Sequence, residues 1–549
     1  MKYIRFILLF FLCISKHLYS QDIPVHPSSE RIYEFLDEMA SLQLIEINSV
    51  VKPFSRATIA GLLSEVNNNK SLLNKRQSEE LEFYLKEFVK EINEFSYSDH
   101  LIKRIAHIRD RQEQRADLFY YRDSLFNLSI NPIGGFRYYI NQKNSLMHQW
   151  TGLEANAYID KRWGFYVNFR DNRASERLVD KSYLINLPGR DNKGNGTDFS
   201  DIRGGASYSW RWGSIAFRKD HFIWGSNYHG SVIFSGRILS IPYLSLNIKP
   251  VKWFEFNYIH AWLVSEVVDS SSIDDFGGGA VRKSFYPKFL AANIYTVKPF
   301  KYLYLSAGNS MVYSSYRAQM AYLIPFLFFK PIEHTIAASN ENNAQIFIDV
   351  SSRNIKHLHF YGTFYVDEVN FGNFFDTAKH SNWFAYKAGV KISDLPIQNL
   401  FFLFEWTRTN PMVYKHYYPT STFESNQYCL GSYLRDNAQE YYIRLTYRPL
   451  KKLHLNFDYT FAEKGPDYPD VRNDPNYFAG GKKFMRNVEW TAKTWRLYAG
   501  YELFHDALIY FEYSNSDISA INQTLLNKYT PAYYQGKTST WSFGVNFGF

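Results

Sequence analysis

The sequence predicts a transmembrane β-barrel of about eighteen antiparallel strands, preceded by a small α-helical periplasmic domain. Three observations lead to this fold class: a two-residue hydrophobic period from about residue 125 onward, connections that alternate between short and long, and an aromatic C-terminal strand. A barrel in lipid places apolar side chains at every second position, because successive side chains of a strand point to opposite faces. No apolar run reaches the ~20 residues that a membrane-spanning helix needs.

Residues 1–20 have the pattern of a secretory signal peptide. Lys2 and Arg5 precede an apolar run, and Ser20 precedes the expected cleavage point. The run is too short for a membrane anchor. After cleavage Cys429 is the one remaining cysteine, so we expect no intramolecular disulfide.

A helical domain and its connection are expected over residues 21–120. Apolar residues recur at every third or fourth position over residues 29–93. Ser55 is expected to cap one helix, and Ser78 to open the next. Residues 94–120, rich in Arg, Asp and Gln, are expected to form the connection. The helices either close the periplasmic mouth of the barrel or form an independent bundle, and the sequence leaves both arrangements open.

The barrel is expected over residues 121–549. His359 and Tyr361 alternate with Leu358 and Phe360, so the polar face of such strands is expected to line the lumen. Short turns are expected near residues 504–506, 448–452, 394–399, 351–356, 297–301, 248–251, 211–213 and 160–162, and long loops near 514–538, 461–488, 409–438, 312–343 and 171–200. An even strand number places both ends of the barrel and the helices in the periplasm, and the long loops outside the cell.

The last strand indicates how the chain reaches its membrane. Apolar side chains at alternate positions form one continuous face, suited to lipid, and they are Trp541, Phe543, Val545, Phe547 and Phe549. Such an ending is typical of outer-membrane barrels. We therefore expect contact with outer-membrane lipid and lipopolysaccharide, and recognition of this strand by the barrel-assembly machinery.

Several segments resemble, in order and spacing, the outer-membrane capsule-assembly family typified by Wzi. The residues that carry the resemblance are Pro53, Phe54, Ser55, Arg56, Arg218, Lys219, Asp220, Ile223, Trp224, Gly225, Gly230, Pro325, Asn342, Asn343, Asp349, Asp367, Glu368, Glu405, Trp406, Thr407, Pro411, Tyr414, Leu430 and Gly431. Their succession spans most of residues 30–549. The segment 288–293 departs from the family pattern, which has a basic residue and a His there.

The resemblance implies an eighteen-stranded outer-membrane lectin with a periplasmic helical bundle, which holds exported polysaccharide at the cell surface. Family members in gliding bacteria are also labelled as motility proteins of the RemB type. The sequence therefore leaves a second function open, in which the barrel acts through motility or adhesion proteins. A third alternative, a diffusion porin, conflicts with the many inward Tyr and Arg side chains.

Two aromatic clusters in the outer loops are the candidate ligand-binding residues. Tyrosine rings beside cations are suited to stacking against sugar rings and pairing with uronic acids, although aromatic residues also form the interfacial girdle of such barrels. The candidates are Tyr414, Lys415, His416, Tyr417 and Tyr418 in one loop, and Tyr529, Tyr533 and Tyr534 in the last loop. The partner expected at this site is surface polysaccharide.

Other motifs give no support for an enzyme or a cofactor. The loop 191–196 lacks the ligands of an EF-hand, and Asp467, Asp470 and Asp474 are more simply solvated loop acids than a calcium site. Asp367 and Glu368 are adjacent on a strand, so their side chains point to opposite faces and do not pair for glycoside hydrolysis. We expect no enzymatic activity, no metal, no cofactor and no nucleic-acid partner.

The mild net charge of +9 is compatible with an anionic polymer or lipopolysaccharide as partner. Charged side chains expected on the luminal face are Arg444, Asp458, Arg496 and Glu502. Opposite charges that face one another in a narrow lumen pair with each other, so we expect these residues to cross-link the interior.

Overall fold

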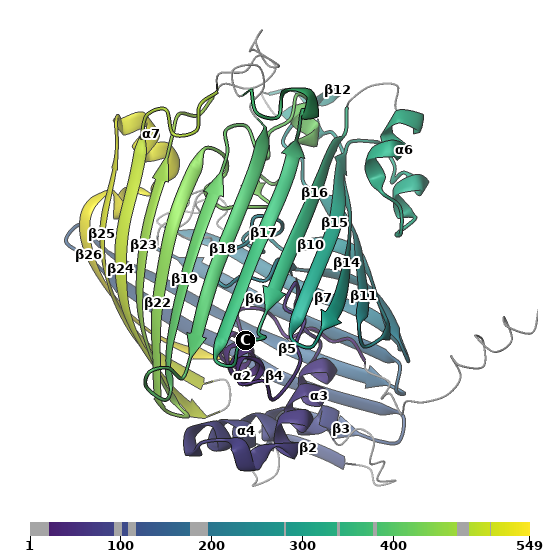
Figure 1. The fold of residues 1–549 in the computed structure, drawn as a ribbon, viewed down its shortest axis with the longest axis vertical. Coiled ribbons are helices and arrows are strands. Elements are labelled where there is room, and N and C mark those ends of the chain that lie inside the picture. The colour runs from purple at the N-terminus through teal and green to yellow at the C-terminus, as the bar shows by residue number, and fades with distance from the viewer. Residues whose placement is uncertain are drawn as a thin grey trace, which may run out of the picture.

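The computed structural model describes residues 21–92, 102–107, 117–175, 196–278, 281–336, 341–376, 382–468, 482–504 and 507–548. Within them, eighteen antiparallel strands form a closed barrel, which confirms the predicted fold class and strand number (Figure 1). The strands are β4 (Phe126–Ile140), β5 (Ser145–Ile159), β6 (Trp163–Ala174), β7 (Thr197–Trp210), β8 (Gly213–Asp220), β10 (Ile241–Val251), β11 (Phe254–Leu263), β14 (Lys288–Phe300), β15 (Leu303–Tyr313), β16 (Asn343–Ser352), β17 (Leu358–Glu368), β18 (Trp383–Ser393), β19 (Leu400–Thr409), β22 (Ala438–Leu450), β23 (Leu453–Lys464), β24 (Trp490–Phe504), β25 (Ala507–Ala520) and β26 (Gly536–Phe547).

Seven of the eight predicted short turns lie where the sequence predicts them, at the lower end of the barrel in Figure 1. The eighth, near 504–506, includes residues outside the described part of the chain. Long connections lie at the opposite end. They carry the hairpin β12 (Val268–Asp275) and β13 (Val281–Phe285), the short pair β20 (Glu424–Ser425) and β21 (Tyr428–Cys429), and the helices α6 (Phe329–Ile336) and α7 (Gln523–Tyr529). β25 continues to Ala520, so the last loop is shorter than predicted. No helix among the described residues is long and apolar enough to cross a membrane.

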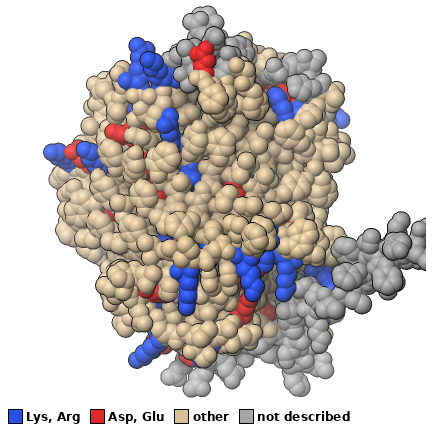
Figure 2. Space-filling model, in the orientation of Figure 1, with Lys and Arg blue, Asp and Glu red and all other residues tan. Residues whose placement is uncertain are grey.

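The strands divide their side chains between lipid and lumen as the alternation predicts. In β16, Ile346, Ile348 and Val350 are exposed on the outer surface, whereas Phe347 and Asp349 are buried inside. The outward faces form a broad surface on which few charged side chains are visible at mid-height, and Lys and Arg gather toward its lower part (Figure 2). This distribution fits a band of lipid around the barrel.

The barrel closes between its last and first strands. β26 pairs with the second half of β4, from Trp541 opposite Ile140 to Phe547 opposite Gly134. The first half of β4 pairs instead with β3 (Asp117–Arg122), which forms a hairpin with β2 (Ile102–His107). β2 and most of β3 lie in the segment 94–120 that the sequence assigns to a connection. The predicted signal peptide and Phe549 lie outside the described residues.

The N-terminal helices are α2 (Glu30–Ser41), α3 (Arg56–Asn68), α4 (Lys75–Glu87) and the single turn α5 (Val89–Ile92). Ser55 caps α3 as predicted, because its side chain accepts a hydrogen bond from the Thr58 backbone N–H. The prediction that Ser78 opens the next helix is wrong. α4 begins at Lys75, and Asn74 and Gln77 form a reciprocal capping box that satisfies free N–H groups one turn earlier.

Residues 21–92, named the plug below, pack against the short-turn end of the barrel. The helices share an apolar core that includes Phe35, Leu63 and Leu81. Charged side chains tie the plug to the wall: Arg31 pairs with Glu502 at 2.7 Å. Of the two arrangements that the sequence leaves open, the structure therefore has the helices at the mouth of the barrel rather than in a separate bundle (Figure 1).

Candidate functional site

The connection between β8 and β10, residues 221–240, folds into the lumen and is named the inner loop. Its two-residue strand β9 (Ile223–Trp224) pairs with β1 (Val51–Lys52) of the plug, so two segments far apart in sequence meet inside the barrel. Gly225 follows with φ +120°, and a Cβ there would lie 2.7 Å from the Asn227 and Ser231 side chains. This position requires glycine.

An apolar cluster fixes the inner loop. Trp224 is 1 % exposed, and its ring centroid lies 5.1 Å from Phe234 of the same loop and 6.0 Å from Phe347 of β16. Phe234 stacks on Phe423 of an outer loop, with centroids 5.6 Å apart. The barrel therefore contains a packed core of its own, which joins the inner loop, the wall and an outer loop.

Hydrogen bonds to buried carboxylates hold the polar part of the inner loop. The Ser226 hydroxyl donates to Asp349 at 2.6 Å, and the Tyr228 backbone N–H donates to Glu405 at 2.8 Å. Lys387 completes this arrangement with an ion pair to Glu405 at 2.7 Å. The loop is thus held by directional bonds as well as by apolar packing.

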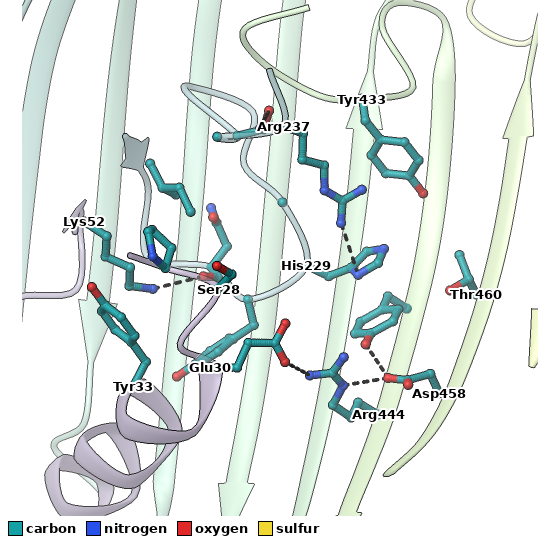
Figure 3. Close-up of a pocket in the computed structure, with 18 of the residues that line it drawn as sticks. Ser28, Glu30, Tyr33, Lys52, His229, Arg237, Tyr433, Arg444, Asp458 and Thr460 are labelled. Carbon is teal, nitrogen blue, oxygen red and sulfur yellow. Dashed lines mark hydrogen bonds and ion pairs between the residues drawn. The ribbon is translucent and has the colours of Figure 1, made fainter. Parts of the chain in front are cut away.

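A chamber of about 620 Å³ lies in the lumen between the plug, the inner loop and the wall formed by β22, β23 and β24. Its size is within the range of small-molecule sites. Figure 3 shows Tyr33 and Glu30 on the plug side, Arg237 and His229 from the inner loop, and Arg444 on the wall.

The chamber wall carries the charge network that the sequence predicts. Asp458 accepts from Arg444 (Figure 3) and from Arg496, each at 2.6 Å, and from the Tyr442 hydroxyl. Glu502 does not join this group, because it pairs with Arg31 of the plug. The wall cations are therefore matched by carboxylates.

The floor of the chamber holds a second network, centred on Asp37 of α2. Lys391 and Arg353 of the barrel each approach its carboxylate to 2.5 Å, and the Tyr228 hydroxyl donates to it at 2.6 Å. Burial alone would raise the pKa of the Asp37 carboxyl, but the two cations hold that pKa well below its usual range. Asp37 is therefore ionised and ties the plug to the wall.

Two further cations of the chamber have different surroundings. The Lys52 ammonium donates to the Asn227 carbonyl oxygen at 3.4 Å and lies 5.7 Å from the ring centroid of Tyr228. The Arg237 guanidinium lies 3.5 Å from His229 Nδ1 and 4.4 Å from the ring centroid of Tyr433. Within the described part of the chain, neither has a carboxylate oxygen within 4.0 Å.

One group of side chains has the spacing of metal ligands. His26, Asp220 and His221 bring ligand atoms within 4.8 Å of one another. The two imidazoles are already in hydrogen-bond contact at 3.0 Å, and Arg203 lies 3.8 Å from the Asp220 carboxylate. A hydrogen-bonded histidine pair beside an ion pair accounts for this group. No sequence motif marks it, because His26 is far from Asp220 and His221 along the chain.

The structure places the predicted cluster 414–418 partly inside the protein. Tyr414 is 5 % exposed, stacks on Phe423 and donates its hydroxyl to the Val232 carbonyl of the inner loop at 2.7 Å. Lys415 pairs with Asp467 at 2.7 Å and with Asp436 at 3.2 Å. His416 and Tyr418 are half-buried, and Tyr417 is exposed.

The second predicted cluster is also a packing element. Tyr529, Tyr533 and Tyr534 are buried in one apolar group with Tyr139 and Trp490. Of the eight candidate residues, Tyr417 is the one with an exposed side chain, and His416 and Tyr418 flank it. Ligand binding by these residues stays a prediction.

Two of the acids that the sequence analysis rejects as functional have structural partners. Asp367 faces inward and accepts the Tyr414 backbone N–H at 2.6 Å, while Glu368 is exposed. Asp467 pairs with Lys415 and Lys528. Asp470, Asp474 and residues 191–195 lie outside the described residues.

Comparison with known proteins identifies the family. The family described as "Capsule assembly protein Wzi" matches residues 142–529, which is more than half of the chain. The chain belongs to the Wzi capsule-assembly family. This confirms the resemblance seen in the sequence, and with the barrel fold it places the protein in the outer membrane.

One solved structure shares the fold, and others show weaker similarity. Escherichia coli Wzi, described as an outer-membrane protein involved in group 1 capsule assembly and a carbohydrate-binding β-barrel, has a TM-score of 0.56 and 11% identity, and the alignment covers 96% of this chain and 100% of that one. Pseudomonas aeruginosa OprD (TM-score 0.41, 10% identity) and Acinetobacter baumannii OccAB2 (0.43, 12%) each align with 76% of this chain, and with 94% and 97% of their own. No curated protein sequence matches significantly.

Proposed function

We propose that the protein is an outer-membrane lectin that holds capsular or related surface polysaccharide at the cell surface. Membership of the Wzi family across residues 142–529 carries this proposal. The role is one of binding rather than catalysis. The lumen supports it too, because the plug and the inner loop occupy space that a diffusion porin would leave open.

In this proposal residues 1–20 direct export, residues 21–120 face the periplasm and the barrel that follows spans the membrane. The apolar outer face contacts lipid and lipopolysaccharide, and β26 is the element that the barrel-assembly machinery recognises. These assignments rest on the sequence pattern and on the sidedness of the turns.

Titration of the detergent-purified mature protein with surface polysaccharide of its own cells tests the proposal. We expect saturable binding of the capsular fraction and none of an extract from a capsule-deficient strain. Absence of binding to both would overturn the lectin function and favour a role through motility or adhesion proteins, which a pull-down from membranes would then have to recover.

The exposed part of the 414–418 segment gives a prediction for the outer surface. Replacing Tyr417 and Tyr418 together by Ala should weaken polysaccharide binding by about 3- to 10-fold, the range expected for lost aromatic contacts. Isothermal titration of the double variant measures this. Tyr316→Ala is the matched control, because Tyr316 is an outer-loop tyrosine, 74% exposed, whose hydroxyl donates to Asp269 of the β12–β13 hairpin.

An unchanged affinity of the Tyr417/Tyr418 variant would remove this patch from the site. Tyr414 is excluded from the test because it is buried and supports the inner loop, so its replacement by Ala would confuse binding with folding.

A further inference from the structure

The two cations without a carboxylate partner, Lys52 and Arg237, set part of the chamber apart from the rest. The cations of the two charge networks each pair with a carboxylate. Arg444 and Arg496 share Asp458, and Lys391 pairs with Asp37. Contacts of 3.4 and 3.5 Å are at the outer limit of hydrogen bonding, so they compensate the two charges weakly.

Removing a cation from water without a counter-ion destabilises a protein. Lys52 and Arg237 are both at most half-exposed and line the chamber. Side chains that reduce the stability of the free protein are common at binding sites, where the ligand supplies the interaction that the protein lacks. For two cations, that interaction is with an anion.

The remaining polar groups of this region favour a sugar over a simple ion. Asn227 of the inner loop also lines the chamber. Its side-chain oxygen is buried and accepts no hydrogen bond from the described residues. Such an acceptor suits a hydroxyl group. Tyr33 and Tyr433 add aromatic surface at the chamber boundary (Figure 3).

We propose that the luminal chamber binds a short segment of an acidic polysaccharide, with Lys52 and Arg237 each taking a carboxylate of a uronic-acid unit and Asn227 accepting a sugar hydroxyl. Figure 3 shows the two cations well apart, which fits carboxylates on different sugar units better than a single one. The proposal rests on the lectin function and names its ligand class and a binding position.

The test uses the mature protein in detergent and two probes, a trimer of galacturonic acid and a neutral trimer of galactose. We expect saturable binding of the acidic trimer and at least tenfold weaker binding of the neutral one. Lys52→Met and Arg237→Met should each reduce affinity for the acidic trimer by at least tenfold, whereas Lys52→Arg keeps the charge and most of the affinity. Arg317→Met, which removes an exposed outer-loop cation, is the matched control.

Thermal unfolding separates a ligand site from a structural role. Without ligand, Lys52→Met and Arg237→Met should unfold at the same temperature as the wild type or higher, because a buried cation with no carboxylate in direct contact is removed. A lower unfolding temperature with unchanged trimer binding would show the cations to be structural and overturn the proposal.

The polysaccharide titration separates failure of the luminal site from failure of the lectin function. Capsular polysaccharide that binds wild type and both Met variants equally would leave the lectin function standing and overturn the luminal site. Binding of the acidic trimer, lost in the variants, without binding of any capsular fraction would support the luminal site and overturn the capsule function. No binding of the acidic trimer at all overturns the luminal site.

The affinity for the acidic trimer should depend on pH, because Lys52 loses its charge at high pH. Burial lowers the pKa of Lys52 to about 8, with Arg353 and Lys391 acting in the same direction and Asp37 against it. The lysine is charged below this pH and neutral above it, so the affinity for the acidic trimer should fall as pH rises from 7 to 9, until wild type equals Lys52→Met. The groups that face Lys52 from the plug, the inner loop and the wall are Asp37, Tyr228, Arg353, His359, Lys391 and Glu405.

Titrations of wild type and Lys52→Met at each pH measure this dependence. Arg237 stays protonated over the whole range, so the Arg237→Met variant should keep the same downward trend from a weaker starting affinity. A wild-type affinity that is constant between pH 7 and 9 would contradict a role for Lys52.

Discussion

Replacing Asp37 by Asn should destabilise the attachment of the plug by about 3–5 kcal/mol, the range measured when one partner of a buried ion pair is removed. Asp37 is the common counter-ion of Lys391 and Arg353, each 2.5 Å away, so the variant leaves two buried cations without an acid. The measurement is a urea titration followed by limited proteolysis, which reports release of residues 21–92 from the detergent-resistant barrel.

The control is Glu82→Gln on α4, which removes an exposed ion pair with Lys70. Exposed pairs contribute less than about 1 kcal/mol, so the plug should be released at nearly the wild-type urea concentration. Equal effects of the two substitutions would mean that Asp37 does not hold the plug.

The same carboxylate predicts how the plug responds to acid. The folded pKa of Asp37 lies well below the unfolded value of about 3.9 because of its two cationic neighbours, although burial acts in the opposite direction. Its contribution to stability is therefore complete above about pH 4 and is lost as the pH falls below that value. Release of the plug in wild type should become easier in acid, and Asp37→Asn should remove most of this dependence.

Trp224→Ala should lower the free energy of unfolding of the inner loop by about 3–5 kcal/mol, because a large buried ring leaves a cavity. Trp224 is 1 % exposed and touches both Phe234 and Phe347, so its removal separates the loop from the wall. We expect increased cleavage within residues 221–240 and intermittent ion conductance in planar bilayers, where wild type conducts little.

Trp253→Ala provides the comparison, since Trp253 is 58% exposed at a short turn and has no part in the luminal core. It should leave cleavage of the inner loop and conductance at wild-type levels. A Trp224 variant that behaves like the Trp253 variant would show that the apolar cluster does not fix the loop.

The sequence predicted the barrel well because the signals for strands and turns lie in residues that are close together along the chain. Turns such as 394–399 and 448–452 interrupt a two-residue period that continues on both sides, and the period itself separates Ile348 from Asp349. The start of α4 was missed although Asn74 and Gln77 are in the sequence, because Ser78 with its two glutamates offered a competing signal. The β2–β3 hairpin was missed because its segment is short and polar.

The site was much harder to predict. Tyrosines such as Tyr414 and Tyr534 have the composition of a sugar site, yet in the structure they fill the cores of their own loops. Lys52 and Arg237 have no local pattern that marks them, because the lack of a counter-ion is a property of the folded lumen. Pairing of β1 with β9 brings their segments together, and no sequence period encodes that pairing.

The attachment of the plug has a consequence for the order of assembly. Asp37 is separated by 316 residues from Arg353 and by 354 from Lys391, and Glu38 by 410 from Arg448. The partners of α2 are thus synthesised and exported long after the helix itself. The helical domain must wait in the periplasm, with these acids exposed to water, until β22 is in place. Docking of the plug is therefore a late event in biogenesis, and a chain truncated before residue 448 would lack the contacts that complete it.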